Sequence, residues 1–154
     1  MIKALITIFS AILLLCGCTT NNQAPQQSGL PIAGTWQLIS GSTIEKGDTT
    51  VTNYTRGLSF IKIINDTHFA FLKHDLKKGK DSTAAFSSGG GSYMLKDNQY
   101  TEHLEYCSDR EWEGNDFTFT ISIQNDTLIQ SGTEKVENAG INRINIEKYT
   151  RVKK

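Results

Sequence analysis

The chain has 154 residues, with 16 lysines and arginines balanced by 16 aspartates and glutamates. This length suits one domain with its own core and is too short for two comfortable ones. The absence of a basic excess removes the usual indication of nucleic-acid binding. A content of 38% hydrophobic and 9% aromatic residues excludes an intrinsically disordered chain.

The first residues have the pattern of an export signal. Lys3 supplies a positive charge before an apolar run of twelve residues, 4–15. Such a run is shorter than the roughly 20 residues that cross a bilayer, but it suits the hydrophobic core of a signal peptide. The sequence therefore predicts a protein that acts outside the cytoplasm.

The apolar run ends in Leu-Cys-Gly-Cys, which resembles a bacterial lipobox. In that motif a small residue directly precedes the acylated cysteine, so Cys18, which follows a glycine, fits the position. The resemblance implies a lipoprotein signal peptide over residues 1–17, a lipid anchor on Cys18 and a flexible polar tether over residues 18–33. The alternative is an ordinary secretory peptide that is cleaved without lipidation.

The residues around the predicted anchor also indicate where it would be placed. Thr19 and the three polar residues after it include no acidic side chain, and no pattern of surface export or inner-membrane retention is evident. In a Gram-negative cell the periplasmic face of the outer membrane is the expected location. Cleavage and acylation would leave Cys107 as the single free cysteine, so no disulfide is expected.

From residue 34 onward, apolar and polar residues alternate with a period of two, and polar turns follow at short intervals. This pattern is typical of antiparallel strands joined by hairpins. About eight strands in simple succession predict an all-β fold, an up-and-down barrel over residues 34–154, rather than a Greek-key sandwich. The predicted strands include residues 36–39, 58–64, 68–74, 86–95, 99–107, 117–123, 128–134 and 141–152.

Two segments interrupt this pattern. Residues 44–56 are interpreted as a loop. Glycines 89–91 lie inside a predicted strand, where they indicate a sharp bend or bulge; the alternative is a flexible loop.

The first strand opens with Gly34-Thr35-Trp36, which resembles the G-x-W signature of lipocalins. Residues 86–95 and 100–106 are similar to segments of small lipocalin-like bacterial lipoproteins. The resemblance covers about residues 34 to 152. It implies a barrel that binds a small lipophilic molecule, with a basic residue of the last strand, Arg151, packed across Trp36. The chain departs from the family in having no clear helix after the last strand and no usual lid pattern.

Strict alternation along residues 99–107 places Tyr100, Glu102, Leu104 and Tyr106 on one face, which we assign to the barrel interior. Glu105 then points outward, so the two glutamates of this segment cannot act together on one bond, as a glycosidase requires.

In the last predicted strand, residues 141–152, one face carries the polar residues Arg143, Asn145, Glu147, Tyr149 and Arg151. Packing of Arg151 on Trp36 would turn this face inward, and a buried charge needs a partner. We therefore expect Arg143 or Arg151 to bridge to Glu102 or Glu147. The alternative is the reverse orientation, with these charges in solvent.

The favoured function is that of a binding protein that carries a small amphipathic or hydrophobic molecule, with aromatic side chains around its body and an arginine for a carboxylate or phosphate head group. No cofactor, metal or nucleophile motif is found. The candidate ligand-binding residues are Tyr100, Glu102, Tyr106, Phe117, Phe119, Arg143 and Tyr149.

Two other functions stay open. A barrel filled by its own side chains could engage another envelope protein through its loops. Less favoured is an enzyme on the barrel scaffold, with Tyr100, Glu102, Tyr106 and Arg143 as its active residues.

The variant Cys18→Ala tests the lipid anchor. Without the acylated thiol, the chain should move almost completely from the membrane fraction to the soluble fraction, because the other residues of the tether are polar. Fractionation followed by immunoblotting measures this change. Continued membrane association of the variant would contradict the anchor.

Overall fold

The structure is a computed structural model that describes residues 29–153. The predicted signal peptide, Cys18 and most of the predicted tether lie outside these residues. The described part contains no helix long and apolar enough to cross a membrane. Its elements are β1 (Gly34–Glu45), β2 (Asp48–Asn53), β3 (Leu58–Ile64), β4 (His68–Asp75), β5 (Phe86–Lys96), β6 (Gln99–Cys107), the short 3-10 helix η1 (Arg110–Trp112), β7 (Asp116–Gln124), β8 (Thr127–Val136) and β9 (Ile141–Arg151).

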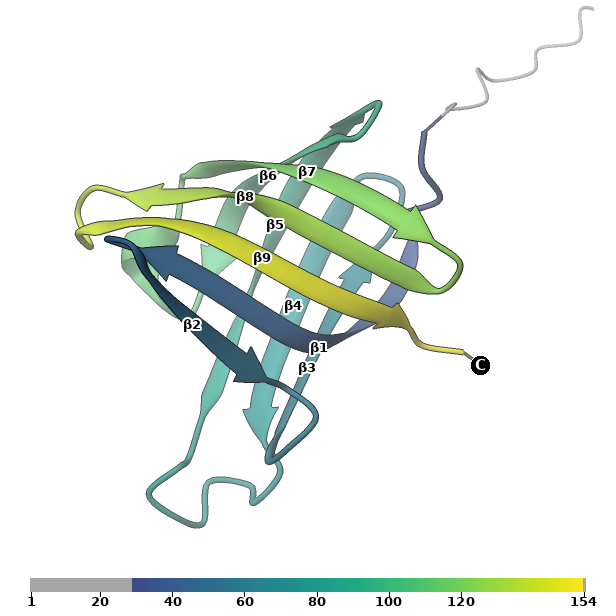
Figure 1. Cartoon of the computed structure of the whole chain (residues 1–154). Helices are drawn as coiled ribbons and strands as arrows, with labels where there is room; N and C mark the ends of the chain where they lie inside the picture. The colour runs from purple at the N-terminus through teal and green to yellow at the C-terminus, as the bar shows by residue number, and fades with distance from the viewer. Residues whose placement is uncertain (1–28, 154) are drawn as a thin grey trace, which may run out of the picture.

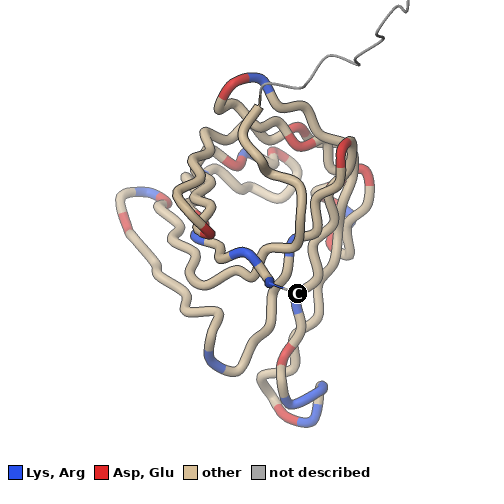
Figure 2. Tube along the Cα trace, turned by 90° about the vertical axis from the view of Figure 1, so that its right-hand side faces the viewer, with Lys and Arg blue, Asp and Glu red and all other residues tan. Residues whose placement is uncertain are grey.

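The strands form a closed antiparallel barrel. From β3 to β9 each strand pairs with the next one in the chain, β1 pairs with β3, and β9 returns to pair with β1. Figure 1 shows the strands in this order, and Figure 2 shows the backbone closing into a ring. Closure satisfies the hydrogen-bonding groups that an open sheet would leave at its edges. The predicted all-β up-and-down barrel is therefore confirmed.

One strand, β2, is additional to the eight of the barrel, and the prediction of a loop over residues 44–56 is wrong. β1 continues to Glu45, and Lys46 and Gly47 then turn the chain with φ angles of 52° and 91°. The following residues, rich in threonine, pair with β1 from Asp48 to Asn53. A tight turn at Lys-Gly and the high β-propensity of threonine explain the hairpin.

One end of the barrel, here called the closed end, is sealed by the segment before β1. Ile32 is buried in the core, and its carbonyl accepts a hydrogen bond of 2.8 Å from the Trp36 indole. The Arg151 guanidinium lies 4.0 Å from the centre of the Trp36 ring and donates to the carbonyls of Pro31 and Ala33. The packing of Arg151 on Trp36 is thus present, and the packed domain includes residues just before Gly34.

The glycine-rich segment of β5 forms part of the barrel wall. Gly91 lies opposite Leu104 of β6, whereas Gly90 lies opposite Tyr106, so Glu105 is an extra residue on β6. The Glu105 carboxylate accepts hydrogen bonds from the backbone and hydroxyl of Ser92. This is a β-bulge at the glycine segment, as predicted there, but its extra residue belongs to β6 and not to the glycine strand.

Close approach of the two backbones explains why glycine occupies position 91. A Cβ atom there would lie 1.9 Å from the His103 carbonyl oxygen and 2.8 Å from the Glu105 nitrogen. Both contacts are with backbone atoms, which cannot turn aside as a flexible side chain does. The bulge therefore depends on the missing side chain.

The variant Gly91→Ala should lower the free energy of unfolding by about 1–3 kcal/mol, the usual cost of forcing an extra carbon into packed structure. Urea unfolding followed by circular dichroism measures the change. The control is Ser122→Ala, on an exposed position of β7, which should leave stability within about 0.5 kcal/mol. Equal stability of the two variants would contradict the close approach.

Candidate functional site

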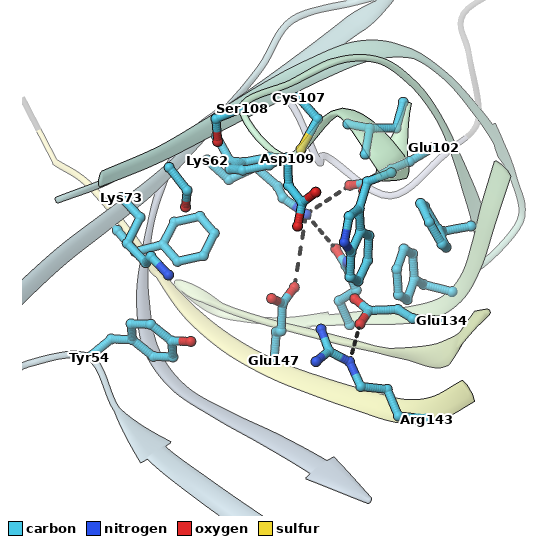
Figure 3. Close-up of a pocket in the computed structure, with 18 residues that line it drawn as sticks. Tyr54, Lys62, Lys73, Glu102, Cys107, Ser108, Asp109, Glu134, Arg143 and Glu147 are labelled. Atoms are coloured by element: carbon cyan, nitrogen blue, oxygen red, sulfur yellow. Dashed lines mark hydrogen bonds and ion pairs between the residues drawn. The ribbon is translucent and has the colours of Figure 1, made fainter. Parts of the chain in front are cut away.

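The barrel interior is divided into a filled half and an open half. Toward the closed end it is occupied by fully buried side chains, among them Trp36, Leu38, Leu128 and Tyr149. Toward the other end, here called the open end, lies a cavity of about 330 Å³ (Figure 3). Its walls carry six aromatic side chains: Tyr54, Phe60, Phe71, Trp112, Phe117 and Phe119.

A buried ion pair between Lys62 and Glu102 lies at the floor of this cavity. Lys62 comes from β3 and is 3% exposed, and its Nζ atom lies 2.7 Å from Glu102 Oε1. The same ammonium donates to Gln130 at 3.1 Å and lies 4.0 Å from Glu147. Four strands of the barrel thereby contribute polar atoms to one cluster (Figure 3).

The surroundings of Lys62 shift the pKa values of the pair. Burial lowers the pKa of the Lys62 ammonium, but the charges of Glu102 and Glu147 oppose this effect and bring it above its ordinary value. Burial raises the pKa of Glu102, and Lys62 only partly offsets the increase. The Tyr149 ring, 5.4 Å from Nζ, adds a favourable cation–π contact.

Two tyrosines of the filled half extend their hydroxyl groups toward this cluster. The Tyr149 hydroxyl donates to Glu147 at 2.7 Å. The Tyr100 hydroxyl is buried and has no hydrogen-bond partner among residues 29–153. Burial and the neighbouring glutamates raise the pKa of both phenols above their ordinary value, so both hydroxyls stay protonated.

A second ion pair lies on the wall. Arg143 Nε donates to Glu134 at 2.7 Å, and Asn145 donates to the other oxygen of that carboxylate at 2.7 Å. The Arg143 guanidinium also lies 5.3 Å from the centre of the Trp112 ring. Trp112 in turn packs against Phe117, so η1 folds back over the open end.

The seven predicted ligand-binding residues fall into three groups: four line the cavity, two are buried in the filled half, and one, Tyr106, points outward. Glu102, Phe117, Phe119 and Arg143 line the cavity. Tyr100 and Tyr149 are fully buried and lie among the side chains that fill the barrel.

Tyr106 is the exception, because it points outward and is 68% exposed. The prediction that it shares the inward face of Tyr100 is wrong, since the bulge at Glu105 reverses the alternation of β6. Strict alternation would turn Cys107 outward together with Glu105, but Cys107 lines the cavity instead. The proposed enzymatic set of Tyr100, Glu102, Tyr106 and Arg143 is therefore not assembled.

The predicted ion pairs are also corrected. The partner of Glu102 is Lys62, whereas Arg143 pairs with Glu134 and Arg151 lies at the closed end. Lys62 stands in an apolar strand, LSFIKII, in which both faces carry large apolar residues. Alternation alone does not tell which face is inside. The polar face of β9 does turn inward, with Asn145 buried and Ile144 exposed.

In the described part of the chain, no three His, Cys, Asp or Glu side chains are grouped as metal ligands would be. The polar groups of the cavity are organised instead as hydrogen-bonded ion pairs. Their arrangement suits the binding of a molecule with an apolar body and a polar group.

The variant Lys62→Met should lower the free energy of unfolding by about 3–5 kcal/mol at neutral pH, because it leaves the Glu102 carboxylate buried without its partner. Burial, and after it the charge of Glu147, then raise the pKa of Glu102 without the opposing charge of Lys62. A raised folded pKa stabilises the fold below the unfolded value of about 4.3, and this stabilisation is lost as the pH rises. The stability lost in Lys62→Met, relative to the wild type, should therefore become smaller as the pH falls toward about 4.

Urea unfolding at both pH values measures this deficit. In the double variant Lys62→Met/Glu102→Gln the penalty of the unpaired charge is removed, so most of the lost stability should return. A deficit independent of pH, or no recovery in the double variant, would contradict the role of this ion pair.

Comparison with known proteins identifies the family of the chain. No curated protein matches the chain. The eight-stranded antiparallel barrel fits a lipocalin-like fold. Residues 31–154 match the family described as a domain of unknown function, DUF4488. Because the match covers most of the chain, the protein belongs to the DUF4488 family.

Proposed function

We propose that the protein binds a small amphipathic molecule in the open half of its barrel. The observation that carries this proposal is the cavity of about 330 Å³, with aromatic walls above a polar floor. Ligand sites are typically 300–1,000 Å³ and are lined mainly by apolar side chains with a few placed polar groups. The cavity is at the lower end of this range, so its ligand is small.

The filled half of the barrel limits the length of the ligand. Trp36, Leu38 and Tyr149 have no exposed surface, and the Lys62–Glu102 pair lies between them and the cavity. A long acyl chain that passes through the barrel would have to displace these side chains. The proposed ligand is therefore a compact molecule, whose apolar body contacts the aromatic rings and whose polar group meets the ion pairs.

We further propose that Cys18 is lipidated and that it anchors the barrel to a membrane outside the cytoplasm, the outer membrane in a Gram-negative cell. The lipobox-like sequence and the polar residues after it support this proposal. Gly29 lies beside Leu95 at the closed end. The tether therefore reaches the barrel at the end opposite the cavity, and the anchor need not obstruct the entrance.

A second candidate function, the recognition of another envelope protein, is favoured by one feature of the outer wall. A shallow hollow of about 300 Å³ lies over the three glycines of β5. It is bordered by Leu72 and Tyr106, which are 42% and 68% exposed. Exposed apolar side chains grouped in this way are typical of contact surfaces.

Two neighbouring serines of β5 separate the two candidates. Ser87 lines the cavity, whereas Ser88 lines the outer hollow. Native mass spectrometry of the gently purified protein should detect a stoichiometric small molecule. Ser87→Phe should lower its occupancy about tenfold, because the added ring fills the cavity entrance. Ser88→Phe is the matched control and should leave occupancy unchanged.

An empty wild-type protein that also takes up no added small amphipathic molecule would contradict the binding function. If Ser88→Phe instead removed a co-purifying protein partner, the second candidate would be supported.

A further inference from the structure

We propose that the ligand carries a cationic head group, an organic amine, which pairs with Glu147 inside the aromatic walls of the cavity. This inference rests on the proposed binding function and specifies the chemistry of the ligand. It differs from the sequence-based expectation of a carboxylate or phosphate held by an arginine.

The residues that line the cavity carry more negative than positive charge. Three carboxylates, Glu102, Glu134 and Glu147, lie inside it with two cations, Lys62 and Arg143. At the entrance, the single charges of Lys73 and Asp109 offset each other. One negative charge in the interior therefore has no counterpart among the described residues, and an unbalanced charge is costly in a largely buried position such as that of Glu147, whose side chain is 14% exposed.

The ion pairs identify Glu147 as the carboxylate whose charge is least compensated. Glu102 takes the short contact with Lys62 at 2.7 Å, and Glu134 is held at both oxygens by Arg143 and Asn145. Glu147 accepts one hydrogen bond, from the Tyr149 hydroxyl to Oε2, and Lys62 lies 4.0 Å from that same oxygen. Within residues 29–153, Oε1 has no partner, and Figure 3 shows this carboxylate within the cavity.

The walls around Glu147 are those that an organic cation prefers. The six aromatic rings offer negative faces, and a cation gains most from such faces when it is removed from water. The protein already uses this contact for its own cations, with Lys62 near Tyr149 and Arg143 over Trp112. An ammonium group bound beside Glu147 would meet both a carboxylate and aromatic surface.

An anionic head group would meet the opposite conditions. Arg143, the expected anion receptor, is already neutralised by Glu134 at 2.7 Å and stacked on Trp112. A second anion there would lie close to Glu134 and Glu147. Burial raises the pKa of Glu102 and of Glu134, and the nearby charge of Glu147 raises both further; an added anion would meet the same repulsion.

Isothermal titration calorimetry with three probes of one shape tests the inference on the purified full chain. The probes are phenethylamine, which is protonated at neutral pH, 2-phenylethanol, which is neutral, and phenylacetate, which is anionic. Phenethylamine should bind at least about tenfold more tightly than phenylethanol, and phenylacetate should bind most weakly, because a close charge contributes strongly in a partly buried site.

The variant Glu147→Gln should remove the preference for the amine by about tenfold and leave the binding of phenylethanol unchanged. Asp66→Asn is the matched control, since it removes one negative charge from the exposed turn between β3 and β4, and it should keep the preference. A thermal melt checks that both variants fold. If Glu147→Gln does not fold, the comparison of the three probes on the wild-type protein still tests whether the cavity prefers a cationic head group.

The outcomes separate this inference from the binding function. Binding of phenylethanol or phenylacetate as tight as that of phenethylamine would overturn the cationic head group and leave the binding function standing. An amine preference that survives in Glu147→Gln would also overturn the role of Glu147. Failure of all three probes to bind would overturn the inference together with the function on which it rests.

Discussion

The buried ion pair of Lys62 and Glu102 is the interaction on which the rest of the interior depends. It lies where the filled half of the barrel meets the cavity, and its side chains are 4% and 9% exposed. Two charges in such a position persist only if the surrounding groups satisfy them. Gln130 accepts a hydrogen bond from Lys62, and Glu147 lies 4.0 Å from the same ammonium. Together with the ion pair, these two residues form the polar floor of the cavity.

The two ends of the barrel are stabilised in different ways. At the closed end, Trp36 and Arg151 tie the first and last strands to the segment that precedes them through packing and backbone hydrogen bonds. At the open end, a tryptophan from η1 covers the wall and leaves space beneath it. A sealed end and an open end on one closed sheet suit the proposed binding of a small molecule, because the cavity can admit it without loss of the barrel.

Much of the fold could be predicted from the sequence, because period-two alternation and hairpin turns are local signals. The strand β3 and the strand β6 have the predicted boundaries. The hairpin that contains β2 was missed because Lys46 is an uncommon residue for the positive φ angle it adopts. Tyr106 was misplaced because one bulged residue shifts every later side chain of β6 to the other face.

The sequence by itself determined the fold class and which residues of β9, and of β6 up to Leu104, share a face, since both follow from alternation along single strands. The inward face of β9 and the inward position of Glu102 rested on two further expectations, the packing of Arg151 on Trp36 and the burial of the aromatic face of β6. Only the tertiary structure decided that Lys62 forms an ion pair with Glu102, that Arg143 forms one with Glu134, and that half of the barrel is filled by side chains. The reason is that an ion pair joins residues 40 positions apart, and the free space in a barrel depends on how side chains from all its strands meet. Neither is a property of a single strand.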